Sequence, residues 1–169
     1  MKLTRKIALI GGMGMVLASS WVLAKQTSAD NEIDRGRYLV AIGGCNDCHT
    51  PDYAQQGGKI AEAEWLTGDR VGWQGPWGTT YPTNLRLMFQ QLSEQEWLAR
   101  ARQPMRPPMP SPSLQAMSER DLRAIYRYLR HLGPKGAPAP AYAPPGASVS
   151  TPYFDFTPKN LPPGPDAAR

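Results

Sequence analysis

The chain has 169 residues, of which 18 are proline and 16 are glycine, so long stretches cannot form regular helix or sheet. Its formal charge is +5, but three of the basic residues lie in the first 24 positions, and the remainder carries only +2. That small excess, with no basic run interleaved with aromatic residues, argues against nucleic-acid binding. The content of two cysteines and two histidines excludes a disulfide framework and a four-ligand zinc site.

Residues 1–24 have the pattern of an export signal. Three basic residues precede an apolar stretch over 7–18, and Val22-Leu23-Ala24 is a suitable cleavage site. We therefore expect a signal peptide over 1–24 and a protein body in the periplasm. The alternative is an anchor retained in the inner membrane, because residues 7–24 reach the lower length limit of a bilayer span.

A first helix is predicted between Asp30 or Asn31, either of which can cap it, and the glycine pair at 43–44 that ends it. Residues 53–87 are rich in glycine and are expected to be irregular, and no segment alternates convincingly as a strand. Large aromatic rings on such a loop must cover something apolar. The rings concerned are Trp65, Trp73, Trp77 and Tyr81.

Two further helices have clear start signals. Ser93 and Glu96 form a capping box, with Leu92 and Trp97 placed as a hydrophobic staple. A second, looser box begins at Ser118, and the helix that follows repeats apolar residues on one face until a glycine–proline pair ends it at 133–134. The apolar positions are Leu122, Ile125, Leu129 and Leu132.

The last segment, residues 134–169, contains ten prolines and is expected to be an extended tail with little structure of its own. The aromatic cluster at 153–156 is a candidate for fixing part of it to the body. The organisation predicted is thus a leader over 1–24, one domain over 25–133 and the tail over 134–169.

The motif that carries chemistry is Cys45-Asn46-Asp47-Cys48-His49, the C-x-x-C-H attachment signature of c-type haem. Two thiols one helical turn apart can add to the two vinyl groups of one porphyrin. The adjacent imidazole is then held under the iron as its proximal ligand. One covalently attached haem c is therefore predicted on Cys45 and Cys48, with His49 on the iron.

Two other interpretations of this motif are weaker. A thioredoxin-like redox pair needs a preceding strand and a βαβ setting, which the sequence does not supply. A zinc site needs two further soft or imidazole ligands, and only the distant His131 remains.

The sixth iron ligand of an electron carrier must come from elsewhere in the chain. Met117 and Met88 have packing roles that explain them, and His131 suits the carboxyl end of its helix. Met105 and Met109 lie in a segment with five prolines in nine residues, which predicts an extended, stiff strut able to hold a weak thioether ligand. We favour Met109, because it has proline on both sides.

The haem motif, the stretch Gly75–Tyr81 leading to Asn84, the Pro108-Met109-Pro110 segment and residues 117–129 together resemble a class I bacterial cytochrome c. The similarity covers residues 33–133 and is greatest to monohaem modules in the cytochrome subunits of periplasmic alcohol and aldehyde dehydrogenases. It implies an all-α fold wrapped around one haem, with Gly36 on the first helix meeting Ile125 and Tyr128 on the last. It also implies Met109 as the sixth ligand.

The function expected is single-electron transfer between periplasmic redox partners rather than enzymatic catalysis. The resemblance suggests a dehydrogenase, a terminal oxidase or another cytochrome as partners. The alternative is a five-coordinate haem protein that binds or senses a small gas or peroxide. Residues 30–69 hold eight acids against three bases and residues 86–130 hold eight arginines against four acids, so we expect a lopsided surface charge that orients docking.

Overall fold

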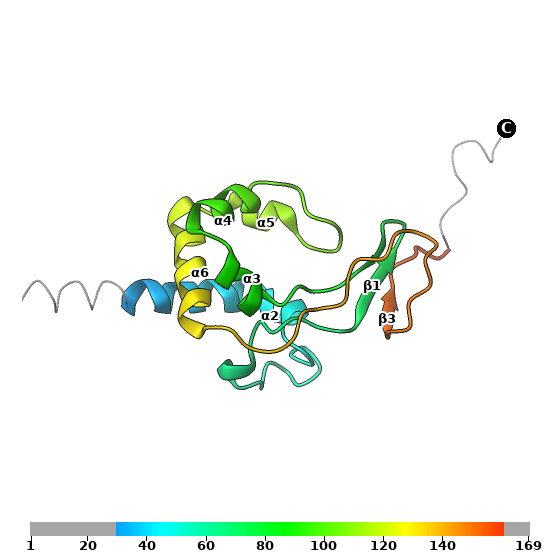
Figure 1. Cartoon of the computed structure of the whole chain (residues 1–169), viewed down its shortest axis with the longest axis horizontal. Coiled ribbons are helices and arrows are strands. Elements are labelled where there is room, and N and C mark those ends of the chain that lie inside the picture. The colour runs from blue at the N-terminus through cyan, green and yellow to red at the C-terminus, as the bar shows by residue number, and fades with distance from the viewer. Residues whose placement is uncertain (1–29, 161–169) are drawn as a thin grey trace, which may run out of the picture.

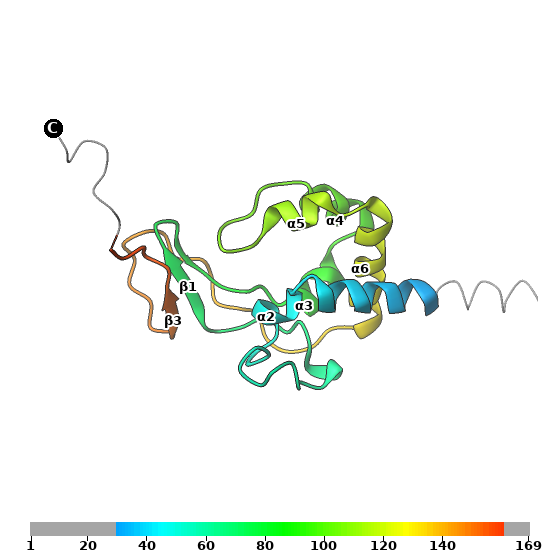
Figure 2. The same cartoon turned by 180° about the vertical axis from the view of Figure 1, so that it is seen from behind.

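The computed structural model describes residues 30–160, so the expected signal peptide and its cleavage site lie outside the described residues. A helix over residues 30–42 packs across the last long helix at one end of the molecule, and a small sheet lies at the other end (Figures 1 and 2). Asp30 and Asn31 are already helical, so neither is the cap that we predicted. The elements that follow are α2 (Cys45–His49), a 3-10 turn (Glu62–Glu64), β1 (Gly72–Gly75), β2 (Gly78–Thr80), α3 (Leu85–Gln91), α4 (Glu94–Ala101), α5 (Ser111–Ala116), α6 (Glu119–Leu132) and β3 (Tyr153–Asp155).

The predicted helix starts at Ser93 and Ser118 are confirmed. Ser93 and Glu96 make both hydrogen bonds of the capping box, and the Ser118 hydroxyl accepts from the backbone N–H of Asp121. The apolar face of α6 packs into the core beside α3 and α4, and Gly133 follows its last turn with a positive φ of 70°. The buried core residues on this face are Leu122, Ala124, Ile125, Tyr128 and Leu129.

The first helix and α6 cross at Gly36. A Cβ built on this glycine would lie 2.1 Å from the Ala124 carbonyl oxygen and 2.6 Å from the Tyr128 Cβ. Tyr128 therefore occupies the position that the family resemblance implied. Ala124 provides the other close contact, whereas Ile125 faces the cavity described below.

Arg86 fixes the region where α6 ends. Its side chain is buried, and its guanidinium donates hydrogen bonds to the carbonyls of Leu132 and Gly133 at the end of α6. It also donates to the carbonyls of Ala63, in the 3-10 turn, and of Trp65, directly after this turn. Burial lowers the pKa of this guanidinium, and the hydrogen bonds compensate part of the cost of burying its charge.

The structure corrects the prediction that no strand is present. β1 lies between β2, to which it is antiparallel, and β3, to which it is parallel. The tail supplies β3, and Phe154 and Phe156 pack on Trp73 with ring centroids 5.2 and 5.1 Å apart. Residues 153–155 of the tail thus join the sheet, and the aromatic cluster fixes this part of the tail to the body as expected.

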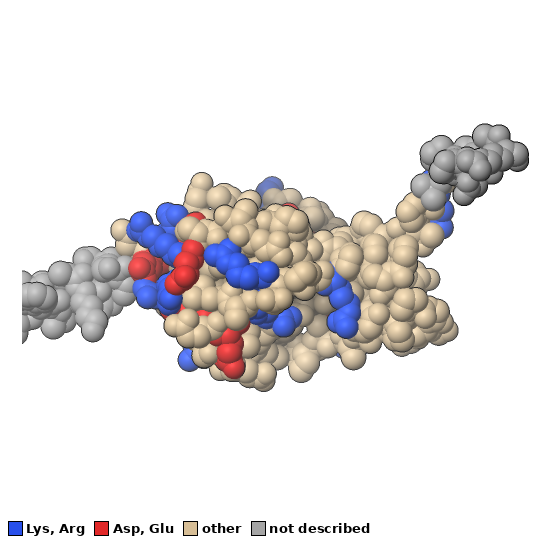
Figure 3. Space-filling view, turned by 90° about the horizontal axis from the view of Figure 1, so that it is seen from above, with Lys and Arg blue, Asp and Glu red and all other residues tan. Residues whose placement is uncertain are grey.

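Charge is distributed differently from the expectation. Arg35 pairs with Asp121, and Glu32 pairs with Arg127, so the acid-rich and arginine-rich segments meet at the crossing of the first helix with α6. Figure 3 shows basic and acidic side chains intermingled at this end and few charges on the opposite end. On the side shown in Figure 3, the two segments therefore do not form separate charged faces.

No helix within residues 30–160 combines the length and the apolar character needed to cross a membrane.

Candidate haem site

The two cysteines lie on one side of the single-turn helix α2. Gly44 precedes this helix with a positive φ of 67°, a left-handed conformation that glycine adopts readily and that turns the chain from the first helix into α2. Burial raises the pKa of the Cys45 thiol to about 11 and also raises the pKa of Cys48. Thiols that stay protonated at neutral pH are unlike the reactive pair of a thioredoxin, whose activity needs a lowered pKa.

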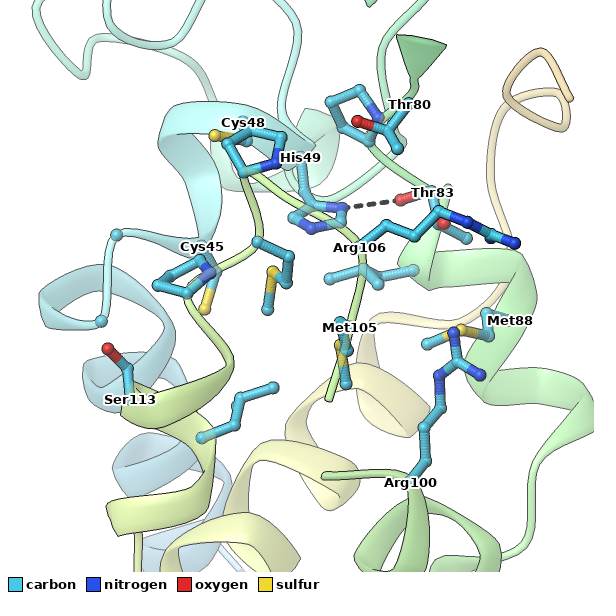
Figure 4. Close-up of a pocket in the computed structure, with 18 of the residues that line it drawn as sticks. Cys45, Cys48, His49, Thr80, Thr83, Met88, Arg100, Met105, Arg106 and Ser113 are labelled. Carbon is cyan, nitrogen blue, oxygen red and sulfur yellow. Dashed lines mark hydrogen bonds between the residues drawn. The ribbon is translucent and has the colours of Figure 1, made fainter. Parts of the chain in front are cut away.

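The imidazole of His49 is oriented by a second segment of the chain. Its Nδ1 lies 2.8 Å from the carbonyl oxygen of Thr83, in the loop between β2 and α3 (Figure 4). Because a carbonyl only accepts, Nδ1 carries the proton and Nε2 keeps a free lone pair. Burial lowers the pKa of His49, partly offset by the Thr83 hydrogen bond, so the neutral form that binds metal is favoured.

Cys45, Cys48 and His49 face one cavity of about 1000 Å³. Its walls come from the first helix, from all the later helices α2–α6, from the sheet strands β1 and β2, from the segment between α4 and α5, and from the tail. Arg100 and Arg106 are charged side chains of this lining, in which residues 30–160 place no carboxylate. Apolar residues that line it include Val40, Leu85, Phe89, Leu114, Ile125 and Leu129.

All four candidate methionines line this cavity, including Met88 and Met117, which we had assigned to packing alone. His131 is exposed near the end of α6 and does not line it. Figure 4 shows Met88 and Met105 with their side chains in the cavity below His49. The structure therefore brings Met105 and Met109 to the same cavity as His49, and Met109 as the iron ligand stays a prediction.

The segment that carries these two methionines is not the extended strut that we expected. It turns between Arg106 and Met109, where the Met109 backbone N–H lies 3.2 Å from the Arg106 carbonyl oxygen. The Thr80 hydroxyl donates to the Pro107 carbonyl over 2.8 Å and attaches the turn to β2. Prolines fix the backbone φ angles here but leave the chain free to reverse direction.

Two of the four loop aromatics that were expected to cover something apolar line this cavity. Trp73 and Tyr81 line it, whereas Trp65 is buried in the core and Trp77 packs on Phe156. Trp97, which we interpreted as a helix staple, also lines it, and its indole N–H donates to the Leu122 carbonyl over 2.8 Å. Pro140 and Tyr142 of the tail are further lining residues without a local sequence signal.

These residues fit a covalently attached haem. Two thiols on one helical turn, an imidazole with a free Nε2, apolar walls and arginines suited to carboxylate side groups are the donor set that this group requires. A small helical fold with this site defines a class I c-type cytochrome. A family model described as "Cytochrome c" matches residues 33–133, and the chain belongs to this family.

Curated relatives point to the same class. The chain is 27% identical over 127 residues to "Alcohol dehydrogenase (quinone), cytochrome c subunit" of Gluconacetobacter polyoxogenes and of Komagataeibacter europaeus. Each match covers 68% of this chain and 25% of the relative, so the chain spans about a quarter of their length. No solved structure matches significantly. The protein is therefore an electron-transfer cytochrome that carries haem c.

Proposed function

We propose that this cytochrome is a single-haem electron carrier of the periplasm, with His49 and Met109 as the two axial ligands of the iron. The observation that supports it best is that one cavity is lined by Cys45, Cys48, His49 and Met109. Haem bound there supplies a reversible one-electron change at its iron.

The residues around the cavity serve to keep the site the same in both oxidation states. The Thr83 carbonyl holds the His49 ring, and the turn at 106–109 is attached to β2 through Thr80. The apolar walls exclude water that would compete with a weak sulfur ligand. A thioether ligand and an apolar pocket both favour the ferrous form, so the potential should exceed that of a site with two histidines.

The partners that we propose are a dehydrogenase as donor, and a terminal oxidase or another cytochrome as acceptor. The relatives named as cytochrome c subunits of quinone-dependent alcohol dehydrogenases support the donor. We also propose that residues 1–24 direct export. A mature protein isolated with Lys25 at its amino terminus supports cleavage, and one that keeps residues 1–24 supports the membrane anchor.

The ligand assignment is tested by comparing Met109→Ala with Met105→Ala in the ferric holoprotein. We expect Met109→Ala to abolish the far-red sulfur-to-iron charge-transfer band and to lower the potential, because water or no ligand replaces the sulfur. Met105→Ala is the matched control and should leave both nearly unchanged. The reverse result would identify Met105 as the sixth ligand of the iron.

Carbon monoxide separates the carrier from a ligand-binding haem protein. A six-coordinate carrier should give sharp low-spin bands when reduced, and carbon monoxide should not shift them. A high-spin ferric spectrum with rapid carbon monoxide binding would refute methionine ligation and favour a five-coordinate protein that binds a gas or peroxide.

A further inference from the structure

The tail lines part of the haem cavity through Pro140 and Tyr142, although it lies outside the residues that match the family. Asn84 fixes its first part, because the side-chain amide donates to the carbonyls of Lys135 and Ala137 at 2.8 and 3.0 Å. Asn84 is itself buried, and its side-chain oxygen caps α3 by accepting from Leu87. The tail thus begins from a well-held point beside the cavity.

A second attachment lies only a few residues further on. Ala143 and Thr79 exchange two backbone hydrogen bonds of 2.8 and 3.0 Å, which join the tail to β2. A Cβ on the neighbouring Gly78 would lie 2.3 Å from the Ala143 carbonyl oxygen, so only glycine allows this close approach. Residues 138–142 are therefore held at both ends.

Tyr142 lies within this held span and lines the haem cavity. The guanidinium carbon of Arg106 lies 4.0 Å from the centroid of its ring, within the range of a cation–π interaction. The Tyr142 hydroxyl donates to the Trp77 carbonyl over 3.0 Å, which fixes the ring by its far end. Figure 4 shows the Arg106 side chain extending away from His49 and Met105.

Arg106 is the residue at which the methionine-bearing turn begins. The turn has one polar attachment to β2, through Thr80 and Pro107, and the stack of Arg106 on Tyr142 attaches it to the tail. Because a thioether binds ferric iron weakly, the fraction of time that the turn is displaced determines how readily another ligand reaches the iron.

We propose that Tyr142 is a positioning residue that holds the Met109-bearing turn over the haem through its stack on Arg106. This inference rests on the proposed function, in which Met109 is the sixth ligand. It assigns to the tail a part in retaining the sixth ligand, in addition to that of the hydrogen bond between Thr80 and Pro107.

The test measures how fast imidazole displaces the sixth ligand in the ferric holoprotein, followed by loss of the charge-transfer band. Tyr142→Ala removes the stack and should raise the displacement rate about two- to fivefold, the population change expected for an exposed cation–π pair. Tyr142→Phe keeps the ring and its stack on Arg106 but loses the Trp77 hydrogen bond that fixes the ring, so its displacement rate should rise less than that of Tyr142→Ala. Phe154→Ala, which removes a tail ring that packs on Trp73, is the control for general loosening of the tail.

A double-mutant cycle isolates the contact itself. In a protein that already carries Arg106→Gln, Tyr142→Ala should cause no further increase. The proposal is overturned if Tyr142→Ala leaves the displacement rate unchanged, or if Tyr142→Phe or Phe154→Ala raises it as much as Tyr142→Ala does. It is also overturned if the effects of Arg106→Gln and Tyr142→Ala on this rate are additive. A wild-type protein without the charge-transfer band, or one in which Met109→Ala leaves the band intact, would instead refute the ligand assignment.

Discussion

Replacing Gly36 by alanine tests the contact on which the two long helices cross. The added methyl would lie 2.1 Å from the Ala124 carbonyl oxygen, and ordinary contacts of a Cβ lie at 3.4–4 Å. Its second neighbour, at 2.6 Å, is the Cβ of Tyr128. Both atoms are fixed to the backbone of α6, so a change of rotamer cannot relieve the overlap and the helices must move apart by about 1 Å or more.

The change in the free energy of unfolding is the difference between two opposing contributions. Overpacking a close contact costs about 1–3 kcal/mol, and alanine gains about 1 kcal/mol over glycine in helix propensity. Because the backbone of both helices resists being moved apart, the overpacking cost should lie near the upper end of its range, at about 3 kcal/mol. Gly36→Ala should therefore lower the free energy of unfolding by about 2 kcal/mol.

Urea unfolding of the ferric holoprotein, followed by far-ultraviolet circular dichroism, measures this loss. Ala41→Gly, at an exposed position of the same helix, is the matched control, because it reports the propensity contribution without the crossing. Ile125 and Leu129 of α6 line the haem cavity, so the haem bands should also shift in Gly36→Ala. A variant as stable as the wild type would refute the close crossing of these helices.

Two further substitutions test interactions of α6. Hydrogen bonds from Ser118 and Arg35 lower the pKa of Asp121 below its ordinary value of 3.8. The stabilisation is therefore present above pH 3.8 and lost as the pH falls through the folded-state pKa. Asp121→Asn should cost about 1 kcal/mol near neutral pH, and urea titrations should show the difference from wild type shrinking in acid. Trp97→Phe removes the hydrogen bond to Leu122 and should cost about 1–2 kcal/mol, seen as a lower urea midpoint with an unchanged slope; an unchanged midpoint would contradict this.

The parts of the fold that the sequence predicts are those specified by neighbouring residues. The capping box at Ser93 and the apolar repeat of α6 depend on spacings of three and four residues, so the pattern is visible locally. The C-x-x-C-H motif is equally local, and it was sufficient to predict the haem attachment.

The missed elements depend on partners that are distant in the sequence. β1 and β2 contain glycine at three positions and have no alternation, and β3 pairs with β1 from about eighty residues further along the chain. α3 depends on its Asn84 cap within a region that glycines had marked as irregular. Tyr142 reaches the haem cavity only because the tail turns back, so no local pattern could have revealed it.

The buried guanidinium of Arg86 determines the direction in which the chain leaves the helical part of the protein. It binds the carbonyls of residues 132 and 133 and two more at the end of the 3-10 turn. A lysine has neither the planar fork nor the several separate N–H groups needed to replace it. With lysine there, the last turn of α6 would fray. Such fraying would then spread to the start of the following segment, and the spectrum of the haem would report a change made more than forty residues earlier in the sequence.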